Sequence, residues 1–330
     1  MEDAMQAIVS TKYGSPDQLE LIEIDKPAVD ANGVLVRVHA AAVNPYDWHE
    51  MRGDPYFGRL MGLGLRRPKR DRRGLDTAGQ VEAVGENVTE LRPGDEVFGT
   101  CHGSFAEYVC GPELKFASKP PRLSFAEAAA IPVAGVTALQ ALRDRGDLQA
   151  GQRVLINGAA GGVGTFAVQI AKALGAETTG VCSTRNVELV RSIGADHVVD
   201  YTVDDFSRSG HQYDLILDTV GNRSFRDLRR ATTAKGTIVV AGGGGGRLFG
   251  PITQIARALM LSPLVSHRVR VVMGNVGKED LVFLKGLVDE GKVTPVVDRT
   301  YPLSEAAEAV RYLEGRHARG KVVITVSDTG

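Results

Sequence analysis

The sequence is poor in the features that mark secreted, membrane-spanning or nucleic-acid-binding proteins. It has only three cysteines, Cys101, Cys110 and Cys182, and no CxxC pair, so no disulfide framework is expected. The 39 basic residues nearly balance the 40 acidic ones, which leaves no bulk field to attract nucleic acid or an anionic membrane. The longest apolar run, residues 258–265, is interrupted by a serine and a proline and cannot span a bilayer.

The length and composition are those of a two-domain globular protein. The first ten residues lack the basic start and the apolar stretch of a signal peptide, so we expect a soluble, cytoplasmic protein. A chain of 330 residues is too long for one typical core. Apolar residues make up 43% and charged residues 24% of the chain, which is ordinary globular composition.

The first third of the chain is rich in short strand patterns separated by glycine and proline. Alternating or apolar segments at residues 34–38, 79–84, 96–98 and 104–109 predict strands. Many short strands of this kind are typical of a partly closed antiparallel barrel.

The pattern changes after the double proline at residues 120–121. Residues 125–143 have a helical pattern, with Ser124 and Glu127 forming a capping box and Pro132 as an interruption. Beyond this point strands and helices alternate, which predicts βαβ units and a doubly wound parallel sheet. The expected strands are residues 153–157, 177–182, 197–200, 213–218 and 236–241, and the expected helices are residues 163–174, 186–193 and 224–233.

The end of the chain is expected to return to the first domain. Residues 278–290 predict a helix, and residues 321–326 a strand that follows no βαβ unit. The predicted domains are therefore 1–124 together with 269–330, and 125–268.

A glycine-rich loop is the main indication of function in the sequence. The expected strand 153–157 leads into Gly158-Ala159-Ala160-Gly161-Gly162-Val163-Gly164 and then into a helix. Small residues let the backbone approach a dinucleotide pyrophosphate, which the N–H groups and dipole of the helix would bind. Compared with G-x-G-x-x-G, Ala159 replaces the first glycine, while Gly161 and Gly164 keep the other two positions.

The end of the second expected strand favours NADPH. An NAD site usually places an acidic residue there to bind the ribose 2′-hydroxyl, but the residues are Cys182-Ser183-Thr184-Arg185-Asn186, and no acid follows until Glu188. Two hydroxyls and a guanidinium suit a 2′-phosphate. The alternative is an ordinary helix start with Ser183 or Thr184 as the N-cap, and both interpretations can hold together.

Two further segments allow more than one interpretation. Residues 66–73 contain six basic side chains, which fits a solvated surface loop better than a nucleic-acid arm, with an anion-facing mouth for substrate or cofactor as a third interpretation. The glycine run 242–246 is either a loop that approaches a ligand closely or a plain connector.

Motifs in a characteristic order resemble the zinc-free quinone oxidoreductase-like branch of the medium-chain dehydrogenase/reductase superfamily. The resemblance covers nearly the whole chain. Its segments are residues 41–48, 74–79, 84–85, 93–99, 103–108, 134–139, 159–164, 192–201 and 218–221.

The resemblance implies a GroES-like β-barrel catalytic domain, a Rossmann cofactor domain and a substrate cleft between them. It places Asn44 at the nicotinamide ribose and Tyr46 near the substrate oxygen, while Asp47 and His49 position neighbours or relay a proton. The further cofactor positions that we expect are Gly158, Ala160, Gly161, Gly162, Val163, Gly164, Ser183, Thr184 and Arg185 in the segments above, together with Thr137, Tyr201, Val220, Gly242 and Lys321.

Structural interpretations compete with several of these roles. Tyr46 and Trp48 would also serve as packing residues, and Asp47 as an N-cap. His49 is more simply a surface residue than a catalytic one. Lys321 would equally well be a solvated residue at a strand start.

Zinc is not expected. Zinc-containing members of the superfamily have a cysteine near the position of Asn44 and a His-Glu pair at the positions of Leu75 and Asp76, and the seven histidines show no ligand spacing. Without a Lewis acid, the expected substrate is a small molecule that is electrophilic by itself, such as a quinone or an α,β-unsaturated carbonyl. The alternatives are an enoyl-thioester reductase and an NADPH-binding structural or interaction protein. The resemblance is also compatible with a homodimer.

Overall fold

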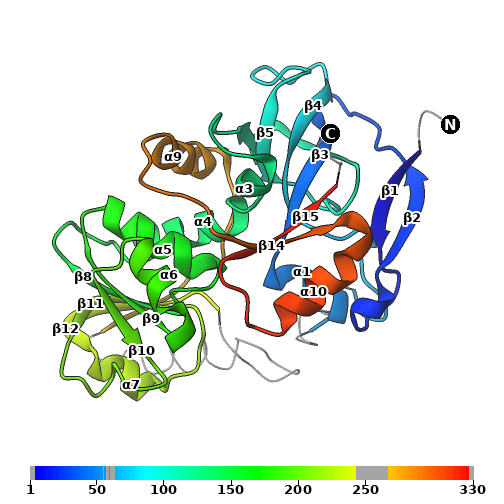
Figure 1. Ribbon diagram of the computed structural model, residues 1–330. Helices are drawn as coiled ribbons and strands as arrows, with labels where there is room; N and C mark the ends of the chain where they lie inside the picture. The colour runs from blue at the N-terminus through cyan, green and yellow to red at the C-terminus, as the bar shows by residue number, and fades with distance from the viewer. Residues whose placement is uncertain (1–3, 55, 57–58, 60–63, 243–266, 327–330) are drawn as a thin grey trace. The chain divides into compact units, whose positions relative to one another are not determined.

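The computed structural model describes residues 4–54, 56, 59, 64–242 and 267–326. The chain divides into two compact units (Figure 1). The first comprises Met1–Val133, Val276–Asp289 and Pro295–Gly330, and the second comprises Ala134–Asn275 and Glu290–Thr294. The glycine run predicted to approach a ligand continues from Gly242 into residues 243–246, which lie outside the described residues.

The first unit is built around one long strand, β3. Its whole length pairs antiparallel with β4, while its first half pairs with β6 and its second half with β15 on the other side. The strands are β1 (Ala4–Val9), β2 (Glu20–Asp25), β3 (Gly33–Val43), β4 (Asp76–Val84), β5 (Glu96–Thr100), β6 (Tyr108–Pro112), β7 (Phe116–Ser118), β14 (Val297–Pro302) and β15 (Lys321–Thr325). The pairing of β15 with β3 confirms that the end of the chain rejoins the first unit.

One predicted strand in this unit is wrong. Residues 104–109 were expected to form a strand, but the ladder with β3 begins only at Tyr108. The preceding residues bond to β1 instead: Phe105 accepts a hydrogen bond from the backbone N–H of Ile8, and the N–H of Glu107 donates to Gln6. Competition between two strands for the same segment explains the shift.

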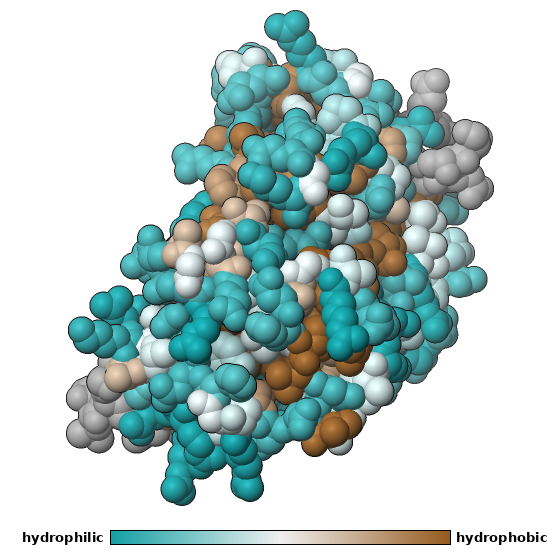
Figure 2. Space-filling model, turned by 60° about the vertical axis from the view of Figure 1, so that its left-hand side comes forward, coloured by the Kyte–Doolittle hydropathy of each residue, from teal (hydrophilic) through white to brown (hydrophobic). Residues whose placement is uncertain are grey.

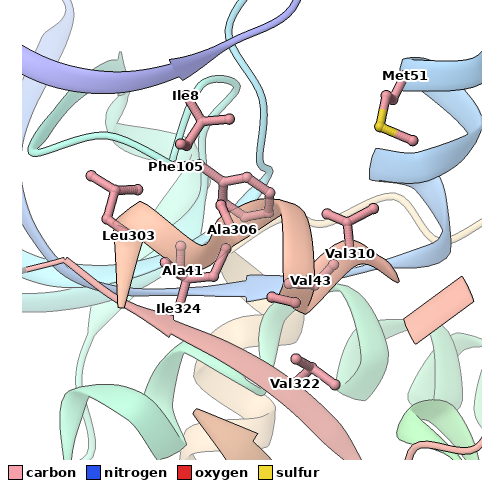
Figure 3. Packing of buried hydrophobic residues seen from close by; sticks show 11 residues of the cluster. Ile8, Ala41, Val43, Met51, Phe105, Leu303, Ala306, Val310, Val322 and Ile324 are labelled. Carbon is pink, nitrogen blue, oxygen red and sulfur yellow. The ribbon is translucent and has the colours of Figure 1, made fainter. Parts of the chain in front are cut away.

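Helix α10 (Ala306–Glu314) closes the core of this unit. Ala306, Ala309 and Val310 are buried at a spacing of three and four residues, which places them on one helical face. Figure 3 shows Ala306 near Phe105 and Ala41, and Val310 beside Val43, all within one cluster of buried residues. The other α-helices with all their residues in this unit are α1 (Pro45–Arg52), α3 (Phe125–Ala129) and α9 (Lys278–Asp289).

The expected long helix over residues 125–143 is divided into shorter pieces. The capping box at Ser124 and Glu127 is confirmed, but α3 ends at Ala129 and α4 (Pro132–Leu139) begins at the proline. A proline cannot continue a helix but is well suited to its first turn. Residues Gln140–Arg145 continue as a π-helical turn.

The second unit is a parallel six-stranded sheet in the order β10-β9-β8-β11-β12-β13. Its strands are β8 (Arg153–Asn157), β9 (Glu177–Cys182), β10 (His197–Asp200), β11 (Tyr213–Asp218), β12 (Thr232–Val240) and β13 (Arg268–Val271), and its further helices are α5 (Gly162–Ala173), α6 (Val187–Ser192) and α7 (Phe225–Arg230). Val154, Leu155 and Ile156 of β8 are fully buried, as expected for a strand covered on both faces. The doubly wound sheet is therefore confirmed.

Hydrophilic side chains cover most of the face displayed in Figure 2, with hydrophobic side chains grouped between them. Across the described ranges, no helix is long and apolar enough to span a membrane.

Candidate active site

Helix α1 positions the three predicted catalytic residues at one end of β3. Asn44 follows the last residue of the strand and is the N-cap of the helix, with Pro45 in the first turn. The backbone N–H of Asn44 donates to the Oδ2 atom of Asp47 over 2.7 Å. The alternative in which Asp47 is the N-cap is thus wrong, because Asp47 lies three residues further on and supports the cap through its carboxylate.

A buried polar network joins α1 to two strands. The Nδ2 atom of Asn44 donates to Oδ2 of Asp76 over 2.9 Å. The Nζ atom of Lys321 donates to Oδ1 of Asn44 over 2.6 Å and lies 3.2 Å from the same Asp76 oxygen. The residues Asn44, Asp47, Asp76 and Lys321 are 2%, 2%, 0% and 3% exposed, respectively. Both polar ends of the Asn44 side chain are therefore fixed.

Lys321 is not the solvated residue at a strand start that one interpretation of the sequence allowed, because it is only 3% exposed. Its ammonium group lies inside the first unit beside Asp76, not in solvent at a strand start. The other oxygen of Asp76 accepts a hydrogen bond from the backbone N–H of Val133 over 2.9 Å. Burial raises the pKa of Asp76, and the charge of Lys321 opposes this rise. No local pattern could predict this pair, because 245 residues separate its members.

Asp47 is a second buried carboxyl group, and one of its oxygen atoms is not used in a hydrogen bond within the described ranges. Its Oδ1 atom has no hydrogen-bond partner among the residues that the structure describes. Burial raises its pKa to about 8, although the hydrogen bond from Asn44 acts against the shift. Asp47 is therefore mostly protonated at neutral pH and can donate a hydrogen bond.

Tyr46 lies on the more open side of α1. Its ring centroid is 6.1 Å from that of His102. Burial raises the pKa of Tyr46, the carboxylate of Glu50 raises it further, and Arg70 opposes the rise through its charge and a side-chain hydrogen bond. The phenol therefore keeps its proton at neutral pH and is a hydrogen-bond donor.

The contacts of His49 and Trp48 support a packing role for both side chains. The two rings are stacked with centroids 3.6 Å apart, and Trp48 packs against the core that includes α10. The Nδ1 atom of His49 is 2.8 Å from the backbone oxygen of Asp54. Burial lowers the pKa of His49, which favours the neutral imidazole. His49 is half-buried and not the open surface residue that the sequence favoured.

In the second unit, the predicted phosphate loop connects β8 to α5. Gly158 has a φ of +91°, a conformation that favours glycine. A Cβ atom on Gly164 would lie 2.0 Å from the carbonyl oxygen of Gly158, whereas a Cβ on Gly161 would meet only that oxygen, at 3.4 Å. Gly164 is thus required for packing, while Gly161, the N-cap of α5, borders open space that a ligand can fill.

Other predicted cofactor residues follow the carboxyl ends of neighbouring strands. Asn157, Asp218 and Val240 are aligned across β8, β11 and β12, so Gly158, Val220 and Gly242 follow at the same edge of the sheet. A Cβ on Gly158 would come 2.7 Å from Cγ2 of Val220, and one on Gly242 would come 2.9 Å from the oxygen of Thr219. Ala160 and Thr137 are buried.

The end of β9 carries the residues predicted to select the cofactor. Thr184 and Arg185 are exposed, and Ser183 is half-buried. Ser183 is the N-cap of a single 3-10 turn, and its side chain makes no capping hydrogen bond. The backbone N–H of Tyr201 donates to Cys182 over 3.0 Å, which anchors the half-exposed tyrosine beside this turn.

One acidic residue near the end of β9 was not predicted from the sequence. Asp200 ends β10 directly beside Cys182 of β9. Its Oδ1 accepts from the hydroxyl of Thr202 over 2.7 Å, and Thr202 is 2.8 Å from the hydroxyl of Thr184. Only the adjacency of β10 and β9 brings this carboxylate close to the segment, so a search along the second strand alone could not find it.

Comparisons with known proteins agree with this architecture. Residues 30–121 match the family model for the alcohol dehydrogenase GroES-like domain, and residues 193–324 match that for a zinc-binding dehydrogenase. No group of three or more histidine, cysteine, aspartate or glutamate side chains able to hold a metal ion occurs in the described ranges.

Similar proteins align along almost the whole chain. A mitochondrial NAD(P)H oxidoreductase of Mus musculus is 35% identical over 98% of this chain and 89% of its own length. The chloroplastic NADPH-dependent alkenal/one oxidoreductase of Arabidopsis thaliana is 34% identical over 97% and 79%. The structure of a quinone oxidoreductase from Coxiella burnetii has a TM-score of 0.84 at 31% identity, covering 98% of this chain and 100% of that one. The chain is an oxidoreductase that belongs to the quinone oxidoreductase-like branch of the medium-chain dehydrogenase/reductase superfamily.

Proposed function

We propose that this enzyme is a zinc-independent, NADPH-dependent oxidoreductase that transfers hydride to a quinone or to the conjugated double bond of an α,β-unsaturated carbonyl. The observation that carries the proposal is the fixed amide of Asn44. Its two polar ends are bonded to Lys321 and Asp76, at the position where zinc-containing members have a thiolate. Leu75, in place of a histidine, offers no ligand atom.

The proposed cofactor site follows from the second unit. The open space beside Gly161 accommodates the pyrophosphate at the N-terminus of α5, where N–H groups and the helix dipole favour negative charge. Ser183, Thr184 and Arg185 are proposed to bind the 2′-phosphate and Tyr201 the adenine ribose. Val220, Gly242 and Thr137 line the path toward the nicotinamide.

The proposed chemistry needs only hydrogen-bond donors from the protein. A bound NADPH supplies the hydride. Tyr46 donates a hydrogen bond to the substrate oxygen, on which negative charge develops, and Asp47 holds a proton at neutral pH close to it in sequence. The residues proposed to touch substrate or cofactor are thus Asn44, Tyr46 and Asp47. The final proton comes from one of these side chains or from water.

The proposal also includes the domain roles, the cellular location and the oligomeric state. The first unit is the proposed catalytic domain and the second unit the proposed cofactor domain; the units divide at Val133 and Val276, a few residues beyond the boundaries expected at 124 and 269. The three cysteines are free, which supports a reducing, cytoplasmic location. A homodimer is proposed from the family resemblance alone.

A substrate panel tests the proposed function. With NADPH, we expect turnover of 1,4-naphthoquinone or pent-3-en-2-one, and no oxidation of a saturated alcohol with NADP⁺. A crotonyl thioester is included because the structure of CurK enoyl reductase is similar at a TM-score of 0.85 and 25% identity. A stoichiometric metal whose removal abolishes activity would contradict the mechanism. NADPH binding without any turnover would favour a structural role.

Gly161→Val tests the phosphate loop. A side chain at this position meets only one protein atom, so we expect an unchanged melting temperature and a loss of NADPH affinity of at least about 100-fold, equivalent to two hydrogen bonds to charged groups. Gly164→Val is the contrasting variant, because its side chain collides with the backbone of Gly158 and should lower the melting temperature. Unaltered NADPH affinity in Gly161→Val would place the phosphate site elsewhere.

Arg185→Ala tests cofactor selection. Loss of a charged hydrogen bond to the 2′-phosphate should weaken NADPH binding by about 10- to 150-fold and leave NADH binding nearly unchanged, as measured by titration at fixed salt. Arg191→Ala, on the adjacent helix and paired with Glu188, should change neither affinity. Equal weakening of both cofactors would make Arg185 structural. A wild-type preference for NADH would instead implicate Asp200 as the ribose-binding acid.

A further inference from the structure

The six basic side chains in residues 66–73 have different surroundings. Arg73 is fully buried, lies 3.3 Å from the carboxylate of Glu50 and donates to the carbonyl of Ser10 over 3.0 Å. Arg72 lies over Gly103, and its backbone forms a bridge with Val9. These two arginines are therefore part of the packing of the first unit and are not general surface charges.

Arg70 is the member of this run that faces the candidate catalytic helix. It is exposed, and its Nη1 atom is 3.5 Å from Nδ1 of His102. The ring of His102 lies beside that of Tyr46, and Arg70 also interacts with the Tyr46 hydroxyl. Three different segments, α1 and the loops at residues 70 and 102, thus bring Tyr46, Arg70 and His102 together.

The charge of Arg70 is only partly compensated, because the buried carboxylate of Glu50 interacts with it over a longer distance than with Arg73. Within the described part of the chain, no carboxylate lies at ion-pair distance from it; the nearby Glu50 is paired with Arg73. Asp71 uses a carboxylate oxygen to accept the backbone N–H of Arg72 over 2.9 Å. His102 is neutral at physiological pH because burial, helped by the charge of Arg70, lowers its pKa to about 4. The group therefore combines one partly compensated positive charge with two neutral hydrogen-bonding rings.

We propose that Arg70, assisted by His102, binds an oxyanion on the substrate beside Tyr46, whose hydroxyl is used for the carbonyl oxygen, so that the preferred acceptors are enones or enoyl compounds that carry a carboxylate or a phosphate. A guanidinium presents paired N–H groups that match both anions. Tyr46 lies two residues from Asn44, which places the anion close to the proposed reaction site. This inference rests on the proposed function and specifies the substrate class for the same site.

The first experiment compares matched acceptors that differ only in charge. The ratio of kcat/KM for 4-oxopent-2-enoate to that for its methyl ester is measured in the wild type, in Arg70→Gln and in Arg66→Gln. The ratio should favour the acid in the wild type and fall by about 10- to 100-fold in Arg70→Gln. Arg66 is an exposed residue of the same basic run, so Arg66→Gln measures how much of the effect comes from the loss of any positive charge in this loop. An equal fall in Arg66→Gln would overturn the proposal, and so would a ratio that is unchanged in Arg70→Gln both here and for the phosphorylated substrate of the second experiment.

A second pair of substrates shows whether the recognised anion is a carboxylate or a phosphate. Crotonyl-phosphopantetheine and crotonyl-pantetheine carry the same thioester on the same arm, with and without a phosphate. If Arg70→Gln lowers the preference for the phosphorylated substrate and leaves the carboxylate ratio intact, the anion is a phosphate; the opposite result identifies a carboxylate. An effect on neither ratio contradicts oxyanion recognition.

A binding measurement keeps the inference separate from turnover. The saturated compound 4-oxopentanoate cannot accept hydride at a conjugated bond, and its binding is measured by ligand-observed NMR with and without NADP⁺. We expect Arg70→Gln to weaken this binding by at least about 10-fold, even if every acceptor in the panel proves inactive. Equal binding by the wild type and Arg70→Gln would refute a carboxylate site while leaving the proposed hydride transfer intact.

Discussion

The buried contact between Lys321 and Asp76 is the constraint on which the first unit depends. It joins the last strand to β4 and, through Asn44, to the start of α1. Removing two charges from water is costly, and only close pairing with additional hydrogen bonds offsets that cost. Asp76 meets this condition because Val133 and Asn44 also donate to it. A strand that arrives 245 residues later in the chain thereby fixes the candidate catalytic helix.

This arrangement has chemical consequences for the residues on α1. Lys321 is directed to Asn44 and Asp76, and its charge only partly counters the burial that raises the pKa of Asp47 to about 8. Asp47 therefore keeps its proton at neutral pH, which fits its proposed role as a hydrogen-bond donor. Acceptors that are already electrophilic suit such a site, since hydrogen-bond donors suffice to stabilise the developing oxyanion. The charge of Arg70 would then select among these acceptors.

Local patterns predicted the second unit better than the first. The strands at residues 153–157 and 177–182 were found from sequence with the bounds that the structure shows, because buried parallel strands have a local signature. Residues 104–109 were assigned wrongly, because two strands compete for them. Within the site, Asn44, Tyr46 and Asp47 were predicted from a segment that resembles the family, and their catalytic roles stay predictions. The contacts of Lys321, Arg70 and Asp200 could not be predicted from sequence, because each contact depends on a partner in another segment of the chain.

A double-mutant cycle on Lys321 and Asp76 tests the central claim most directly. The free energy of unfolding is measured for the wild type, Lys321→Met, Asp76→Asn and the double variant, with the exposed pair Lys26 and Glu82 as a control whose coupling should stay below about 1 kcal/mol. Each single change at the buried pair should cost about 3–5 kcal/mol, because it leaves its partner buried and uncompensated. The double variant should lose much less than the sum. Additive losses, within about 0.5 kcal/mol, would show that the two groups do not stabilise each other and would contradict this account.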